Sequence, residues 1–123
     1  MPAKTWQQNM LGITFRYADG RITVFRSALE SIGRPEFYHF LYNPTKQMFA
    51  IQACGMDAEG ANRVPKKNQD DRYEIKSKNL VRLIYQSCGW DRTRSYRLPG
   101  VEYPQQRLVN YDLCRALPIF EGR

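Results

Sequence analysis

Two arginines, Arg16 and Arg21, flank the pair Asp19-Gly20 within a stretch of alternating apolar and polar residues. The guanidinium group of arginine is a planar fork of donors, so it can bind a phosphate or read the edge of a guanine. A second basic run, interrupted by Asp70, Asp71 and Glu74, comprises Arg63, Lys66, Lys67, Arg72, Lys76, Lys78 and Arg82. Lysines in a polar connector suit phosphate contacts that neutralise charge without reading a base sequence. Both groups indicate a polyanionic ligand, and ordinary solvated surface charge is the alternative for each.

A third group interleaves arginines with aromatic residues near the C-terminal end, and it comprises Trp90, Arg92, Arg94, Tyr96, Arg97 and Tyr103. Surfaces of this composition can stack unpaired bases between aromatic rings and guanidinium planes. Aromatic residues at strand spacing are also typical of a hydrophobic core, and that is the competing interpretation.

Residues that could support catalysis lack partners. His39 lies among aromatic residues, with no serine, cysteine or carboxylate at a spacing typical of a general base. Asp57, Glu59, Asp70 and Asp71 lie in loops and have no third ligand at a spacing that suits magnesium. No Walker loop, Gly-x-Gly-x-x-Gly or nucleophile elbow occurs. We therefore expect a binding protein with no metal and no cofactor, and an enzyme with an unfamiliar site is a third alternative.

Composition supports a folded, basic protein. The chain has 123 residues, 42% of them hydrophobic, and 19 Lys and Arg against 12 Asp and Glu give a net charge of +7. This imbalance favours nucleic acid as the first candidate partner and an acidic protein surface as the second. With no membrane-length apolar run and no signal peptide, we expect a cytoplasmic protein. Cys54, Cys88 and Cys114 are widely separated, so buried reduced thiols are expected.

The elements that must position these residues follow from hydrophobic periodicity and turn residues. Asp-Gly between two alternating runs is a strong hairpin signal, because both turn positions need positive φ. Gly33 and Gly89 are placed to end helices, and Ser77 is placed to cap one. The predicted elements are strands 13–17 and 22–24, a helix 26–32, strands 36–43 and 47–53, a strand 73–76, a helix 78–88, and strands 95–98 and 107–113.

The first half of the chain resembles the swapped-hairpin DNA-binding domains of AbrB-type regulators and MazE-type antitoxins. The resemblance covers residues 12–53: a strand, an acidic-Gly-Arg turn, a β-branched strand and a short helix that ends in glycine. It implies that Arg16 and Arg21 contact DNA. The family often has arginines near the end of its helix, where this chain has Glu30, so Arg26 and Arg34 at the two helix ends are the substitutes.

The order strand–helix–strand–strand occurs in 22–53 and again in 73–113. We therefore expect an α+β fold of two β-α-β-β units, in which small antiparallel sheets pack with two short helices. The two units are a possible internal pseudo-duplication. Such a chain would be a monomeric pseudo-dimer or a homodimer. The predicted segments are a leader 1–11, an AbrB-like ββαββ unit 12–53, a polar basic connector 54–72, a second unit 73–114 in one compact domain with the first, and a tail 115–123.

Besides the enzyme alternative, two functions remain open from the sequence. The first is a small DNA-binding transcriptional regulator or antitoxin-like repressor, with duplex DNA as the favoured partner. The second is a phage or mobile-element inhibitor, similar in general type to anti-CRISPR proteins, which binds a host protein or a ribonucleoprotein nuclease. The residues predicted to bind nucleic acid are Arg16, Arg21, Arg26, Arg34, Arg63, Lys66, Lys67, Arg72, Lys76 and Lys78.

Overall fold

The computed structural model describes residues 11–119, so residues 1–10 of the predicted leader and 120–123 of the predicted tail lie outside the described residues. It contains two five-stranded antiparallel sheets and the helices α2 and α3, which confirms the expected α+β class. In chain order the elements are β1 (Ile13–Arg16), β2 (Arg21–Phe25), α2 (Arg26–Ser31), β3 (Phe37–Asn43), β4 (Met48–Cys54), β5 (Asn62–Arg63), β6 (Arg72–Lys76), α3 (Lys78–Cys88), β7 (Ser95–Leu98), β8 (Gly100–Tyr103), the 3-10 turn η1 (Pro104–Gln106), β9 (Leu108–Asp112), the 3-10 turn η2 (Leu113–Arg115) and β10 (Leu117–Ile119).

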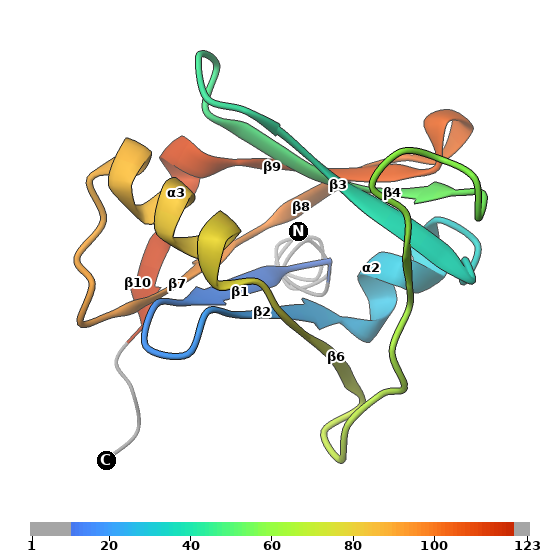
Figure 1. Ribbon diagram of the computed structural model, residues 1–123, viewed down its shortest axis with the longest axis horizontal. Coiled ribbons are helices and arrows are strands. Elements are labelled where there is room, and N and C mark those ends of the chain that lie inside the picture. The colour runs from blue at the N-terminus through green and yellow to red at the C-terminus, as the bar shows by residue number, and fades with distance from the viewer. Residues whose placement is uncertain (1–10, 120–123) are drawn as a thin grey trace, which may run out of the picture.

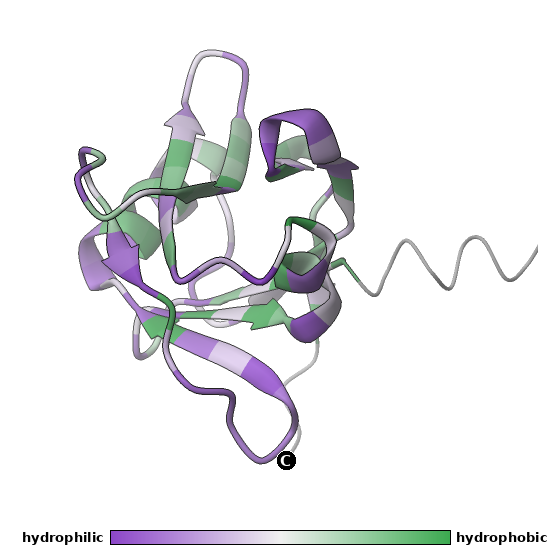
Figure 2. Ribbon diagram, turned by 90° about the vertical axis from the view of Figure 1, so that its right-hand side faces the viewer, coloured by the Kyte–Doolittle hydropathy of each residue, from purple (hydrophilic) through white to green (hydrophobic). Residues whose placement is uncertain are grey.

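We name the two sheets after a central strand of each. The β1 sheet has the strand order β10-β7-β1-β2-β6, and the β4 sheet has the order β5-β3-β4-β9-β8. Figure 1 shows the sheets as two layers, with α3 near one end and α2 near the other. Figure 2 shows hydrophobic residues on many strand segments between the layers, whereas the connector loop that leads into β6 is hydrophilic.

The predicted hairpin joins β1 to β2, with Arg16 opposite Arg21 at the turn end. Gly20 has φ +64°, a left-handed value that glycine adopts without the strain a side chain would bring. A Cβ at this position would lie 2.6 Å from the Cα of Lys78, so the turn packs directly on the start of α3. The hairpin turn and the helix are therefore held together by a close contact between backbones.

Helix α3 matches its predicted bounds. Its buried face consists of Val81, Ile84 and Tyr85, at three- and four-residue spacing, and Gly89 ends it with φ +68°. Ser77 precedes the helix, but its side chain makes no capping hydrogen bond, so the expected cap is wrong.

One hydrophobic core joins residues from both predicted units. Phe15 of the β1 sheet and Phe49 of the β4 sheet meet edge to face, with ring centroids 5.3 Å apart. Tyr111 of β9 is buried, and its hydroxyl donates to the carbonyl oxygen of Leu11 over 2.9 Å. Burial raises the pKa of Tyr111, so this phenol stays protonated and keeps its donor.

The structure differs from the prediction in the C-terminal third. Residues 100–103, expected as a break between strands, form strand β8. The chain passes at Pro99 from the β1 sheet, which contains β7, into the β4 sheet, which contains β8. The predicted connector contains β5, and the predicted tail contains β10. Cys54 and Cys88 are partly buried and Cys114 is exposed, so the expectation of three buried thiols is wrong, although all three are free.

The two predicted β-α-β-β units differ in how their strands pair. In the first, β3 and β4 form a hairpin with each other. In the second, β7 belongs to the β1 sheet and β9 to the β4 sheet, with β8 between them in the sequence. The hairpin β1–β2 is flanked on both sides by strands of its own chain, β7 beside β1 and β6 beside β2.

No helix within residues 11–119 is both long and apolar enough to cross a membrane.

Candidate nucleic-acid interface

The outward face of the β1 sheet gathers basic side chains from four neighbouring strands. Side chains alternate between faces along a strand, so residues opposite one another in the register share a face. The register places Arg16 opposite Arg21, and Arg21 opposite Lys76, in one row across β1, β2 and β6. We define the basic face as this row together with Arg72 of β6 and Arg97 of β7, which point to the same side.

Carboxylates within the basic face neutralise part of its charge. Arg21 lies 3.2 Å from Asp19 and 3.0 Å from Glu74, while Arg16 is 3.9 Å from Asp19. Lys76 is exposed and forms no ion pair with any residue in 11–119. Five cations against two carboxylates leave a net positive face, and Lys76 is its least compensated member in the row.

Phe25 lies at the α2 end of the basic face with two guanidinium groups close to its ring. The Arg72 group is 4.6 Å from the ring centroid and the Arg97 group is 5.3 Å away. These contacts hold the two arginines over an aromatic ring in place of a carboxylate. No carboxylate of the described residues therefore neutralises the charge of either arginine, although the Nε of Arg97 is buried without a hydrogen-bond partner.

A second group of predicted residues forms a separate corner where β2 meets α2. Arg26 pairs with Asp71 and also lies 3.4 Å from Glu30, while Lys67 is 2.9 Å from Asp71. The hydrogen bond from Lys67, helped by the charge of Arg26, lowers the pKa of Asp71. The positive charges at this corner are thus largely balanced by neighbouring acids.

The remaining predicted residues are not brought to the basic face. Arg34 follows α2 and pairs with Glu30 at 3.3 Å. Arg63 is on β5 of the other sheet, 2.7 Å from Glu36 and with its guanidinium 4.8 Å from the ring centroid of Phe37. Lys66 lies exposed in the connector, and Lys78 is exposed at the first position of α3.

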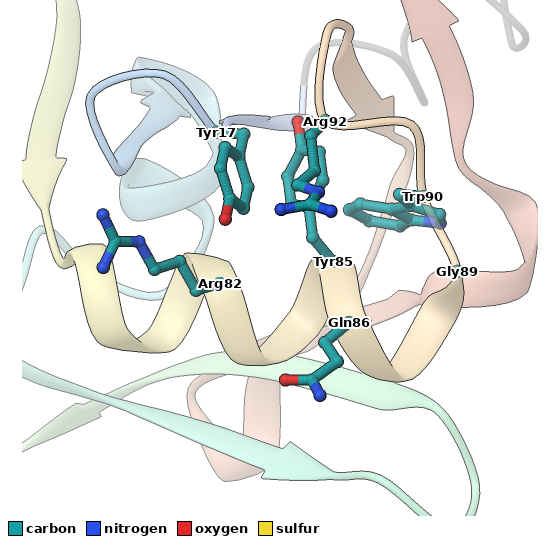
Figure 3. A pocket seen from close by; sticks show the side chains of 7 residues that line it. All are labelled: Tyr17, Arg82, Tyr85, Gln86, Gly89, Trp90 and Arg92. Carbon is teal, nitrogen blue, oxygen red and sulfur yellow. The ribbon is translucent and has the colours of Figure 1, made fainter.

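A pocket of about 510 Å³ opens beside the β1–β2 turn (Figure 3). Its volume is within the range of about 300–1,000 Å³ typical of small-molecule sites. The lining residues come from the turn, from one face of α3 and from the loop after that helix, and they are Tyr17, Arg82, Tyr85, Gln86, Gly89, Trp90 and Arg92.

Aromatic contacts fix the inner wall of this pocket. Tyr85 meets Tyr17 and Trp90 edge to face, with ring centroids 5.1 Å and 5.2 Å apart. Trp90 also stacks on Tyr96, with centroids 4.5 Å apart and planes at 21°. The Tyr85 hydroxyl donates to the carbonyl oxygen of Phe15 over 3.1 Å, which anchors the helix to β1.

The outer part of the pocket is positively charged. Figure 3 shows Arg92 in front of the aromatic wall, between Tyr17 and Trp90, and Arg82 extending from α3. The Arg92 guanidinium lies 5.8 Å from the centroid of the Tyr17 ring. No carboxylate is among the lining residues.

The carboxylate nearest in sequence to Arg92 has other partners. Asp91 accepts hydrogen bonds from the backbone and the hydroxyl of Thr93, which lower its pKa, and it lies 3.6 Å from Arg94. No ion pair forms between Arg82 or Arg92 and any residue of the described chain.

The structure divides the aromatic and arginine-rich group that the sequence singled out. Trp90 and Arg92 line the pocket, Arg97 lies on the basic face, and Tyr103 is on β8 of the other sheet. Tyr17 was missed as a site residue, because its role depends on α3, which begins about sixty residues later in the chain. Within residues 11–119, no three His, Cys, Asp or Glu side chains gather in a way that could hold a metal ion.

Comparison of the chain with protein-family models, curated protein sequences and solved structures gives no match.

Proposed function

We propose that this protein binds nucleic acid through the basic face of the β1 sheet and acts as a transcriptional regulator or antitoxin-like repressor. Duplex DNA is the favoured partner. The observation that supports the proposal is the register, which aligns Arg16, Arg21 and Lys76 across three strands of one exposed face. The resemblance of residues 12–53 to AbrB-type domains motivates the regulatory role, and it implies the same first two arginines.

Phosphate neutralisation supplies the affinity in this proposal. An extended row of cations on a sheet suits the regular spacing of a nucleic-acid backbone, and such contacts carry no base sequence by themselves. Thr14 and Thr23 lie between the basic positions on the same face and can donate hydrogen bonds to phosphate oxygens.

Fluorescence anisotropy with a random-sequence duplex tests the proposal directly. Affinity should fall steeply between 50 and 200 mM salt, because each phosphate contact releases counterions. Binding that does not change with salt, or the absence of binding at 50 mM, would refute a function based on this face.

A second candidate function, inhibition of a host protein or ribonucleoprotein nuclease, has its own supporting observation. The outward face of the β4 sheet exposes apolar side chains, with Leu41 at 41%, Val101 at 54% and Tyr103 at 45% of their surface. The register aligns Leu41, Ala50, Asn110 and Val101 in one row without a charged side chain. Exposed apolar surface of this kind is typical of protein-binding sites.

One double substitution distinguishes the two functions. Leu41→Ser with Val101→Ser should leave DNA binding unchanged and should abolish capture of a host partner only if the second function is correct. Lys76→Glu should abolish DNA binding if the first function is correct, and it should leave the capture of a host partner unchanged.

A further inference from the structure

The pocket beside the β1–β2 turn combines two kinds of group, aromatic rings and guanidinium groups. Its inner wall is aromatic, with Tyr17 and Trp90 partly exposed to the cavity. Its outer part carries the exposed guanidinium groups of Arg82 and Arg92. A simple anion would leave the aromatic wall unused, and an uncharged aromatic compound would leave two cations unpaired. The lining therefore matches a ligand that has both a planar ring and an anionic group.

The two arginines contrast with several other arginines of the described residues. Arg21, Arg26 and Arg63, for example, each lie within 3.5 Å of a carboxylate. Arg82 and Arg92 have no such partner within the described residues, and Asp91, between Trp90 and Arg92, is engaged by Thr93 and Arg94. The pocket mouth thus carries positive charge that no carboxylate of the described residues neutralises.

The position of the pocket links it to the basic face. Tyr17 directly follows Arg16, and the row of Arg16, Arg21 and Lys76 lies at the same end of the hairpin. A strand whose phosphates lie along this row would approach the pocket with its next nucleotide. A base inside a duplex cannot reach an aromatic wall of this kind, whereas an unpaired base can stack on it.

We propose that this pocket binds one nucleotide unit, with the base against Tyr17 and Trp90 and the phosphate held by Arg82 and Arg92. The unit is either a free nucleoside monophosphate or an unpaired nucleotide of a strand on the basic face. The second form rests on the proposed function, and the first does not. Arg92 lies on the exposed loop after α3 and moves off the Tyr17 ring to make room for the base.

Tryptophan fluorescence tests the proposal without a nucleic-acid duplex. The chain has two tryptophans, so a Trp6→Phe variant reports on Trp90 alone. In this variant, adenosine 5′-monophosphate should quench the fluorescence with at least about tenfold higher affinity than adenosine or inorganic phosphate, because only the nucleotide engages both parts of the pocket. Adding Arg92→Gln should weaken the nucleotide about tenfold, whereas Arg63→Gln, which removes the same charge far from the pocket, should not.

The outcomes separate this proposal from the proposed function. Quenching by the nucleotide without duplex binding supports the pocket and refutes the role of the basic face. Duplex binding without nucleotide quenching, or equal effects of Arg92→Gln and Arg63→Gln, refutes the pocket. A single-stranded hexamer that binds more tightly than the mononucleotide identifies an unpaired strand as the source of the ligand, and the reverse order identifies a free nucleotide.

Discussion

Neutralising one lysine on the basic face should change the salt dependence of DNA binding by a predictable amount. Lys76 is the suitable residue, because it is exposed and has no ion pair within residues 11–119. Arg21 is less suitable, since Arg21→Glu would place a third carboxylate beside Asp19 and Glu74 and would destabilise the sheet itself.

The magnitude follows from the number of cations on the face. If each of its five cations neutralises one phosphate, the slope of log K against log salt is about −4.5, or a loss of about 500-fold between 50 and 200 mM. Lys76→Gln reduces the slope to about −3.6, and the loss over the same range falls to about 150-fold. The substitution should not change the free energy of unfolding measurably, because an exposed, unpaired lysine contributes little to stability.

Anisotropy titrations at four salt concentrations measure this slope for the wild type and for two variants. Arg63→Gln is the matched control, since it removes one charge from β5 of the other sheet. If Lys76→Gln and Arg63→Gln change the slope equally, the protein responds only to net charge, and the assignment of the basic face is wrong.

Three further predictions concern the supports of the site. Gly20→Ala should lower the free energy of unfolding by at least about 1 kcal/mol and the melting temperature by several degrees, because φ is +64° and the new Cβ meets the backbone of Lys78. An unchanged melting curve would contradict this prediction. Tyr85→Phe should cost about 1–3 kcal/mol in urea denaturation, since the one hydroxyl proton that the carbonyl oxygens of Phe15 and Arg94 share is lost, and a loss below 0.5 kcal/mol would show that water replaces it. Iodoacetamide at pH 8 should modify exposed Cys114 before Cys88, because burial raises the pKa of the Cys88 thiol and less of its thiolate is present. Mass spectrometry gives the order of modification, and faster reaction of Cys88 would refute its partial burial.

Local signals predicted the parts of the fold that depend on few neighbours. The hairpin forms where Asp19-Gly20 predicted it, but its loop spans residues 17–20 and only Gly20, not Asp19, has the expected positive φ, whereas Gly89 ends α3 in the left-handed conformation expected from the sequence. Pro99-Gly100 was interpreted as the end of a strand, but the same pair lies where the chain crosses between sheets and continues as β8. Distinguishing a break from a crossing requires knowledge of the second sheet.

The candidate site depends on contacts that no local pattern contains. The sequence identified Arg16, Arg21 and Lys76 as separate basic residues, but their common row exists only because β6 pairs with β2 some fifty positions away. The carboxylates that neutralise other predicted arginines are also distant in the sequence, so no local pattern indicates them. Examples are Glu74, which pairs with Arg21, and Asp71, which pairs with Arg26. Sequence reasoning therefore found the cations but could not tell which of them are available to a ligand.

The order of the strands also bears on how this protein tolerates high concentration. Two open sheets have four edges, and an exposed edge strand is a template for pairing with another molecule. Here β5 has only two residues, β10 carries Pro118, which has no N–H to donate, and β6 alternates Arg72, Glu74 and Lys76 on its outward side. Within residues 11–119, three of the four edges thus discourage edge-to-edge aggregation, and β8 is the edge without such a feature, at which intermolecular strand addition would begin.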